Sequence, residues 1–430
     1  MTRRSISPLL TPLGIVGMAA LAAFTFDRTY AAGGLNFDPF ATAYACVVLL
    51  YVASRFGVAL LYRPGCDRGF EPNVAVVVPA FNEEAAIEAT VTAILALDYS
   101  AEKLEVVVID DGSTDGTGLV ISRLARENPR VHPILFPQNR GKRAAMAAGI
   151  RATSAEILAF VDSDSVLEPD ALYVLVQDFA DGDVGAVAGH ADVLNERESF
   201  VARMQAVRYF VAFRVYKAAE SVFGAVSCCS GCFSAYRREA ILPSLDDWEN
   251  QMFLGLPSTF GDDRSLTNFV LLDWRVLYQA RAVSRTIVPT TCSGFVRQQA
   301  RWKRSWTRES LVVARFFWRK HPAAVVPMYL SIVLPLLAPV SVLRALLWRP
   351  FVDVADAPLV YFCGLATGAL LYGLYFELRS RRGDAMWLFG FLFAFFYVGV
   401  LVWQTYYAIC TSRTAKWGTR GSAAPAAIVA

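Results

Sequence analysis

Apolar segments at both ends of the chain limit the folds that this sequence can adopt. Two of them, residues 9–26 and 40–62, precede a polar middle, and three more follow it at 323–347, 357–377 and 385–410. A helix needs about 20 apolar residues to cross the hydrocarbon core of a bilayer. With 55% hydrophobic and 18% charged residues, the chain is also too apolar for an ordinary soluble enzyme. The sequence therefore predicts a protein that is integral to a lipid bilayer.

Basic residues beside the apolar segments predict how the chain crosses the membrane. Arg3 and Arg4 precede the first segment and Arg63 and Arg68 follow the second, so the positive-inside bias favours a hairpin with both ends in the cytoplasm. The last segment has basic residues on both sides, yet it is too short for two full spans. We expect a re-entrant or broken segment there, because irregular backbone is tolerated at membrane depth when protein surrounds it. The net charge of only +3 gives no global basic field, so no nucleic-acid partner is expected.

The polar middle of the chain has the pattern of an α/β domain. Short β-branched runs such as "VAVVVPA", "LEVVVIDD" and "EILAFVDSD" alternate with helical stretches. This alternation predicts a mostly parallel sheet, on which ligands bind beyond the carboxyl ends of the strands. We therefore expect four regions: a transmembrane hairpin at 1–68, the α/β domain at 69–320, a membrane region at 321–411 and a cytoplasmic tail at 412–430.

Two acidic turns follow predicted strands. In "VVVIDDGSTDGTG", Asp110 and Asp111 end a strand, where they are either ordinary turn residues or acceptors of hydrogen bonds from the base or ribose of a nucleotide. In "FVDSDS", Asp162 and Asp164 lie one residue apart, and two such carboxylates can chelate a hard divalent cation that holds a diphosphate. Two carboxylates with this spacing, taken alone, often belong to an ordinary solvated loop. The position of this pair at a strand end, in the same domain as the first turn, favours a site for Mg²⁺ or Mn²⁺.

Two further motifs begin predicted helices. In "NRGKRAAMAAGI", Lys142 stands at a helix N-terminus, so this cation either neutralises phosphate or is an ordinary basic helix end. In "FGDDRSLTNFVLL", Asp262 and Asp263 start another helix. Capping would explain one acid, but not two followed by Arg264. We therefore interpret the pair as catalytic carboxylates, one of which takes the proton of a sugar hydroxyl.

The stretch "RQQARWKRSW" combines aromatic and basic residues just before the third apolar segment. Gln298, Arg301 and Trp302 lie on one face of the predicted helix. An aromatic face suits the apolar side of a sugar ring, and an arginine binds phosphate bidentately. A belt at the membrane surface would have the same composition. We expect a helix at the interface that also binds sugar.

Six motifs, in order along the chain, resemble those of the processive family 2 glycosyltransferases of membranes, and most closely those of the hyaluronan synthases. They are "DDGSTD", "DSD", "CCSGCFSAYRRE", "NQMFLGLPSTFGDDRSLTN", "QQARW" and "KWGTRG". The resemblance implies a GT-A domain that binds a UDP-sugar with Mg²⁺ or Mn²⁺, inverts the anomeric carbon and exports the product through its own membrane channel. It also implies a multi-pass protein of the plasma membrane whose catalytic domain is cytoplasmic.

The resemblance implies roles in donor binding for the matching residues. Asp111, next to Asp110, would contact the uridine, and Asp164 would hold the metal with Asp162 nearby. The diphosphate would be contacted by Lys142, Arg301 and Gln298. A gating loop that closes over UDP would consist of Trp417, Gly418, Thr419 and Arg420.

Further roles are implied for the acceptor. Asp263 would be the general base, with Asp262 beside it, and Trp302 would underlie the acceptor sugar. The acceptor would also meet Ser230, Gly231 and Cys232, where the family commonly has Ser-Gly-Pro. Loss of the proline loosens this loop.

The product expected from the resemblance is hyaluronan, made from UDP-glucuronic acid and UDP-N-acetylglucosamine as a growing polysaccharide. The nearest alternative is a chitin or chitooligosaccharide synthase, which would use UDP-N-acetylglucosamine alone. An alternative of another class is a transporter or receptor that senses a UDP-sugar without catalysis.

Overall fold

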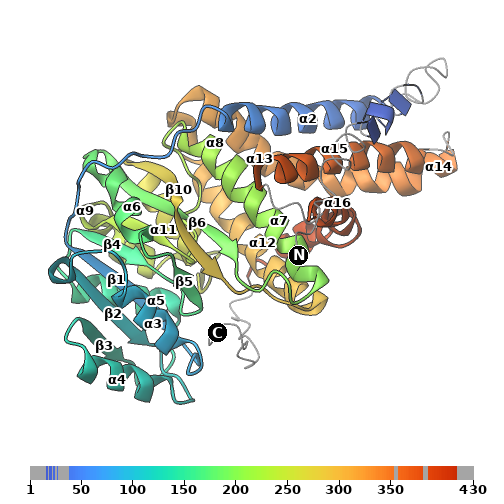
Figure 1. The fold of residues 1–430 in the computed structure, drawn as a ribbon. Coiled ribbons are helices and arrows are strands. Elements are labelled where there is room, and N and C mark those ends of the chain that lie inside the picture. The colour runs from blue at the N-terminus through green and yellow to red at the C-terminus, as the bar shows by residue number, and fades with distance from the viewer. Residues whose placement is uncertain are drawn as a thin grey trace, which may run out of the picture.

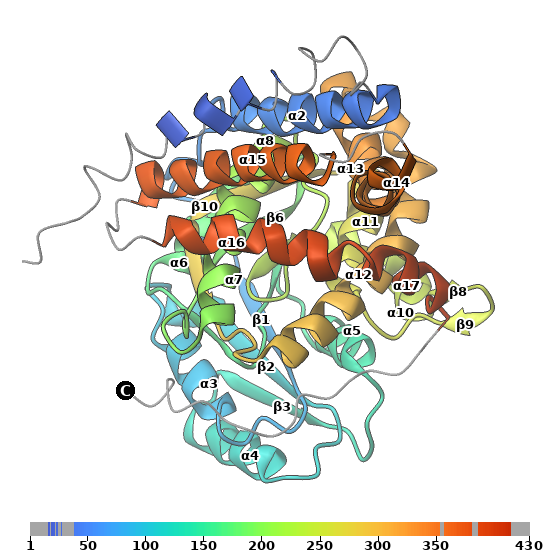
Figure 2. The same ribbon diagram turned by 90° about the vertical axis from the view of Figure 1, so that its right-hand side faces the viewer.

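The computed structural model describes residues 38–352, 357–380 and 386–413, together with short pieces between residues 16 and 27. An α/β domain lies beside a group of long helices (Figure 1). These helices are α2 (Pro39–Ala59), α13 (Pro322–Leu343) and α15 (Ala357–Ser380), and they gather on one side of the domain (Figures 1 and 2). Segments from both ends of the chain therefore form one helical layer, as the flanking apolar segments predict.

An eight-stranded sheet forms the centre of the domain, in the order β3-β2-β1-β4-β7-β6-β10-β5. β1 pairs in parallel with β2 and β4, and β2 with β3. β6 and β10 also pair in parallel, whereas β7 and β5 are antiparallel to their neighbours. The strands are Val74–Ala80 (β1), Leu104–Asp110 (β2), Val131–Leu135 (β3), Ile157–Phe160 (β4), Ser165–Leu167 (β5), Val184–Val193 (β6), Ser234–Arg237 (β7) and Arg275–Thr286 (β10). The mostly parallel sheet confirms the predicted fold class.

Apolar side chains cover both faces of the sheet. One face packs on α3 (Ile87–Leu95), α4 (Thr117–Glu127) and α6 (Ala171–Val176), and the other on α5 (Lys142–Ala152) and α11 (Asp262–Leu271). A central strand such as β1 is an almost continuous run of buried Val and Ala, which suits a strand covered by helices on both sides. β1 and β4 contain no polar side chain along their length.

Two helices connect the domain with the apolar helices. α7 (Phe200–Val211) continues through a π-helical turn into α8 (Ala218–Ser221), and it packs on α16 (Trp387–Phe396). α12 (Cys292–Ala314) packs on α17 (Gln404–Cys410). The stretch "RQQARWKRSW" is part of α12, so the helix predicted at this place is confirmed.

Three helices among the described residues are long and apolar enough to span a membrane, by length and composition. They cover Pro39–Ala59, Pro322–Val352 and Ala357–Glu377. The last apolar segment is a helix pair, Trp387–Leu401 and Gln404–Cys410, bent by 40°. A bent pair suits the broken or re-entrant segment that we expect, and its path through a membrane stays a prediction. Most of the first predicted segment, at 9–26, lies outside the described residues.

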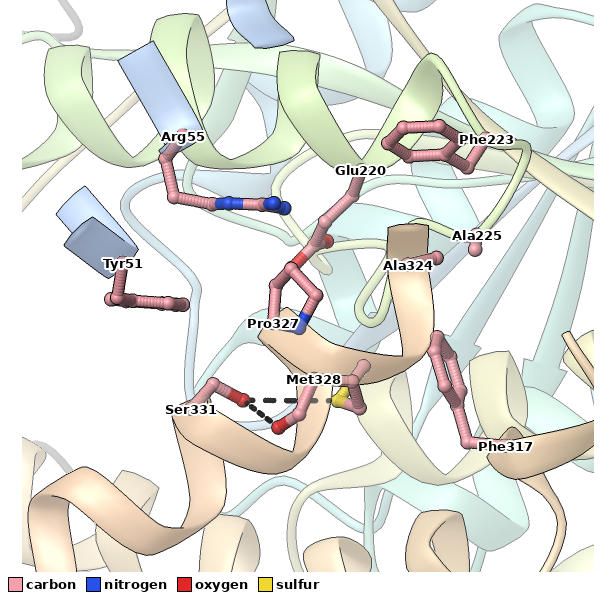
Figure 3. A pocket seen from close by; sticks show the side chains of 10 residues that line it. All are labelled: Tyr51, Arg55, Glu220, Phe223, Ala225, Phe317, Ala324, Pro327, Met328 and Ser331. Atoms are coloured by element: carbon pink, nitrogen blue, oxygen red, sulfur yellow. Dashed lines mark hydrogen bonds between the residues drawn. The ribbon is translucent and has the colours of Figure 1, made fainter. Parts of the chain in front are cut away.

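A small cavity where α2, α8 and α13 meet contains two charged side chains (Figure 3). The guanidinium of Arg55, on α2, is buried and points toward Glu220 of α8 (Figure 3). The carboxylate of Glu220 accepts a hydrogen bond from the backbone N–H of Ser227 at 2.9 Å. The cavity encloses about 20 Å³, which is room for one water molecule. Because Ser227 begins the loop that leads to Gly231, this junction connects a predicted membrane span with the predicted acceptor loop.

Candidate active site

Acidic side chains gather at the carboxyl edge of the parallel strands. β2 ends at Asp110, and Asp162 and Asp164 closely follow β4. β1 lies between these two strands and pairs with both. The two acidic turns are therefore two strand spacings apart, about 10 Å. This is the edge at which ligands bind on open parallel sheets.

Asp110 and Asp111 shape the loops that follow β2 and β3. Asp111 is buried, and its carboxylate accepts hydrogen bonds from the backbone N–H groups of Arg140 (2.7 Å) and Gly141 (2.9 Å). Burial raises the pKa of the Asp111 carboxyl above its ordinary value. Asp110 accepts a hydrogen bond from the backbone N–H of Ser113 at 2.9 Å. Asp111 thus fixes the turn that starts α5, and its contact with uridine stays a prediction.

Lys142, the first residue of α5, lies between carboxylates from two different motifs. Its Nζ is 2.6 Å from Oδ1 of Asp162 and 3.7 Å from Oδ1 of Asp263. Burial alone would lower the pKa of the Lys142 ammonium, but the two carboxylates outweigh burial and hold this pKa above its ordinary value. The lysine therefore stays charged at neutral pH and offsets the repulsion between the two acids.

Gly231 allows these three charged groups to approach one another. A Cβ at this position would lie 2.9 Å from Nζ of Lys142 and 3.0 Å from Oδ1 of both Asp162 and Asp263. Its carbonyl also accepts a hydrogen bond from the backbone N–H of Asp162 at 3.0 Å. Any side chain would fill the space between the three groups. The loop predicted to meet the acceptor therefore borders the same site as the acids predicted to bind the donor.

Asp262 and Asp263, at the start of α11, lie in different environments. The Asp262 side chain is only 2% exposed, and its Oδ1 accepts a hydrogen bond from Nε of Arg143 at 2.8 Å. The Asp263 side chain is 32% exposed and faces Lys142. Burial raises the pKa of the Asp263 carboxyl, and Lys142 opposes this rise only in part. A raised pKa makes a carboxylate a better general base at neutral pH.

The catalytic role expected of Asp262 stays a prediction. Its carboxylate is buried and paired with Arg143, an environment that favours anchoring the start of α11. Asp263 is the more exposed of the two acids.

The helix that carries Trp302 packs against the start of α11. Trp302 is exposed on α12, and Ser305 lies one turn further along the helix. Gly261 directly precedes α11, and a Cβ there would lie 1.8 Å from Oγ of Ser305. The tryptophan predicted to carry the acceptor and the predicted base, Asp263, are therefore on helices in direct contact.

The structure also locates the remaining predicted residues. Gln298 and Arg301 are half-buried on α12, the helix that carries Trp302. Cys232 is half-buried as well, and burial raises the pKa of its thiol, so this cysteine is a neutral thiol. The gating residues, Trp417–Arg420, lie outside the described residues.

Asp162 and Asp164 are the predicted ligands of a divalent metal. Carboxylates are the hard oxygen ligands that Mg²⁺ and Mn²⁺ prefer. In the described part of the chain, no group of three or more His, Cys, Asp or Glu side chains is arranged to hold an ion. The two acids therefore fit a cation that takes its other ligands from a diphosphate and water, and they do not fit an ion held by protein side chains alone.

Two buried ion pairs that support the site were not predicted from the sequence. Besides Asp262, Arg143 binds the carbonyl of Trp248 (2.8 Å) and Oε1 of Gln251 (3.0 Å). Arg143 follows Lys142 as Asp263 follows Asp262, so consecutive cations of α5 meet consecutive acids of α11. The two adjacent cations and the two adjacent acids were the only signal in the sequence. Nothing in the sequence indicated which cation pairs with which acid.

The second ion pair lies on α12. Nε of Arg308 is 2.7 Å from Oε1 of Glu309, and Arg308 also donates to the carbonyl of Phe260. Glu309 accepts a further hydrogen bond from Nδ2 of Asn268, on α11, at 2.9 Å. These contacts fix α12 on α11. Sequence position alone gives no sign of them.

Comparison with known proteins identifies relatives that cover most of the chain. The profile of the family described as "Glycosyl transferase family 2" matches residues 75–242. The hyaluronan synthase of Streptococcus pyogenes is 32% identical over 386 residues, which cover 88% of this chain and 90% of that protein. An N-acetylglucosaminyltransferase of Sinorhizobium fredii (strain NBRC 101917 / NGR234) is 33% identical over 398 residues, covering 90% and 92%.

A solved structure shares the fold. It is the mannosyltransferase PcManGT from Pyrobaculum calidifontis, in complex with GDP-Man and Mn²⁺. It matches with a TM-score of 0.53 at 24% identity, covering 83% of this chain and 98% of that one. This likeness, together with the mostly parallel sheet, confirms the predicted GT-A fold.

Proposed function

The chain belongs to glycosyltransferase family 2, and we propose that it is a processive, inverting synthase that polymerises sugars from UDP-glucuronic acid and UDP-N-acetylglucosamine into hyaluronan. One observation carries the catalytic part of this proposal. Lys142 holds Asp162, a predicted ligand of the metal, and Asp263, the predicted base, within ion-pair distance of a single ammonium. A residue predicted to bind the donor and a residue predicted to activate the acceptor are thus next to each other. The likeness to the Streptococcus pyogenes enzyme over most of both chains supports the choice of product.

In the proposed reaction, Asp263 accepts the proton of an acceptor hydroxyl while the hydroxyl oxygen attacks the anomeric carbon of the donor. The new glycosidic bond forms as the bond from the anomeric carbon to UDP breaks, so the configuration inverts. Lys142 offsets the charge of the departing diphosphate. A bound Mg²⁺ or Mn²⁺, held by Asp162 and Asp164, would supply Lewis-acid stabilisation of the same leaving group.

The other predicted residues position the two sugars. Trp302 offers its exposed ring to the acceptor, as aromatic faces do for the C–H side of a sugar. Arg301 and Gln298, on the same helix, are proposed to face the diphosphate, and Asp111 the uridine. We propose that Trp417–Arg420 close over UDP from the cytoplasmic side of the plasma membrane.

Supplying the purified protein with each UDP-sugar singly, and then with both, tests the function. Polymer that forms only with both donors and that a hyaluronan-specific lyase digests would support the proposal. The 33% identity to the Sinorhizobium fredii enzyme favours one rival, a synthase that uses UDP-N-acetylglucosamine alone. Polymer from that single donor would establish this rival. UDP-sugar binding without any glycosidic bond would instead point to a sensor or transporter.

A further inference from the structure

A cation without an anionic partner lies beside Trp302. Arg208, near the end of α7, is half-buried, and in the described part of the chain its guanidinium has no hydrogen bond or ion pair. Its contacts are with two aromatic rings: its Cζ lies 5.6 Å from the ring centroid of Trp302 and 5.7 Å from that of Phe393. The guanidinium therefore joins α12 to α16, and its N–H donors have no hydrogen-bond partner among the described residues.

Aromatic contacts alone do not account for a charge at this place. A cation over an aromatic ring is stabilised only modestly. Removing an ion from water costs more than this contact returns unless a counter-charge is present. Burial accordingly lowers the pKa of the Arg208 guanidinium from its ordinary value. An anion that visits the site would offset this cost.

Lys303 adds a second positive charge to the same junction. Its Nζ donates to the carbonyl of Leu401 and, at 2.9 Å, to Oγ1 of Thr405. Burial and the nearby Arg208 together lower the pKa of the Lys303 ammonium to about 8. The hydrogen bonds of Lys303 are used to hold the last apolar segment, whereas those of Arg208 are not. Arg208 lies where α7, α12 and α16 meet, and Lys303 contacts the residues that follow α16.

We propose that Arg208 binds the carboxylate of uronic acid units in the growing polysaccharide as they pass Trp302. A planar guanidinium matches a carboxylate with two parallel hydrogen bonds. The inference rests on the proposed function, because only a polymer that contains a hexuronic acid brings a carboxylate past this tryptophan. It deepens that function by naming the residue that distinguishes an acidic product from a neutral one. In a polymer of N-acetylglucosamine alone, this arginine would meet no counter-charge.

Binding of short oligosaccharides tests the proposal without turnover. We expect the Arg208→Met variant, purified in nanodiscs, to bind a hyaluronan tetrasaccharide at least about tenfold more weakly than the unmodified protein, because a charge-assisted hydrogen bond contributes about 1.5–3 kcal/mol. Its affinity for chitotetraose, which has no carboxylate, should change by less than about threefold, since only a neutral contact is lost. Isothermal titration calorimetry measures both affinities.

Arg203 provides a matched control on the same helix. Its Cζ lies 5.3 Å from the ring centroid of Phe389, so it makes the same kind of aromatic contact with α16, away from Trp302. Arg203→Met should leave both affinities unchanged. Arg208→Lys, which keeps the positive charge, should retain part of the preference for the acidic oligosaccharide. It also serves as the test if Arg208→Met does not fold.

The outcomes separate this inference from the proposed function. Equal losses for both oligosaccharides, or no loss for either, would overturn the role of Arg208. The lyase digest of the product made by the unmodified protein decides the proposed function independently. A neutral product together with an intact preference for the acidic oligosaccharide would refute the function and leave the binding site standing.

Discussion

Neighbouring residues of the same type lie in different environments in this site. Asp262 is sealed against Arg143, whereas Asp263 is partly exposed beside Lys142. The first carboxylate suits a role in positioning α11, and the second is the proposed general base. Chemical identity therefore does not define the role of either residue, and the environment of each side chain does.

Replacing the predicted base should remove catalysis and leave the fold intact. We expect Asp263→Asn to lower the rate of polymer synthesis by about 10²–10⁴, because an amide cannot accept the acceptor proton. UDP binding, measured by calorimetry, should persist. Full activity of this variant would refute the assignment.

The adjacent Asp262→Asn substitution is the control, and we expect it to lower stability more than the catalytic rate. It leaves Arg143 buried without its counter-charge, which costs about 3–5 kcal/mol and should appear as a lower melting temperature. A loss of rate in Asp262→Asn at unchanged melting temperature would mean that this acid has a catalytic role after all.

Asp178 predicts a dependence of stability on pH. Burial raises the pKa of this carboxyl to about 6 in the folded protein. A carboxyl whose pKa is higher in the folded state binds more protons when folded, so stability falls as pH rises from the ordinary aspartate value through about 6. In Asp178→Asn, the melting temperature should fall less between pH 5 and pH 7 than in the unmodified protein, at the same detergent concentration. Identical slopes would show that Asp178 ionises normally.

At the level of helices, the site depends on how closely α12 approaches α11. Gly261 has a φ of +79°, and no side chain fits between it and Ser305. The contact at this glycine places the face with Trp302 next to the start of α11. Arg308 and Glu309 then fix the two helices by buried hydrogen bonds.

Adding a methyl group at Gly261 should separate the two helices. We expect Gly261→Ala to reduce polymer synthesis at least about tenfold, because α12 must move or a left-handed backbone costing about 1–2 kcal/mol must change. Gly255 has the same φ of +79° but nothing within 4 Å of its Cβ position, so Gly255→Ala carries the backbone cost alone. Equal activities of the two variants would show that the contact with Ser305 is unimportant. Product assays and melting temperatures of both variants provide the comparison.

At the scale of the whole molecule, side chains connect the apolar helices with the α/β domain. Arg55 of α2 points toward Glu220, which holds the loop to Gly231, and Lys303 of α12 holds the last apolar segment. A movement of the apolar helices would therefore reach the loop at Gly231. Such a link suits the proposed coupling of polymer growth to export.

The predicted path of the chain through the membrane can be tested with reporters. A reporter fused after Ala430 should be found inside the cell, because a re-entrant last segment returns the tail to the side of the α/β domain. One inserted at 353–356, between the second and third of the long apolar helices, should be found outside. A reporter after Ala430 on the outer face would eliminate the re-entrant segment.

The sequence by itself determined the elements that depend on local patterns. The β-branched runs gave the strands of the parallel sheet, and three apolar segments formed helices of spanning length, because periodicity and hydropathy are properties of a short stretch of chain. The acidic ends of β2 and β4 also follow from order along the chain. Family membership was likewise recognisable from motifs in sequence order.

Only the tertiary structure decided which of these residues meet. Arg143 seals Asp262 across 119 residues of chain, and Arg208 reaches Trp302 from a different helix. Burial and pairing set the pKa and the exposure of each acid, and both depend on packing between distant segments. The local sequence pattern therefore identifies the candidate residues, and packing between distant segments determines which of them are buried and which are exposed.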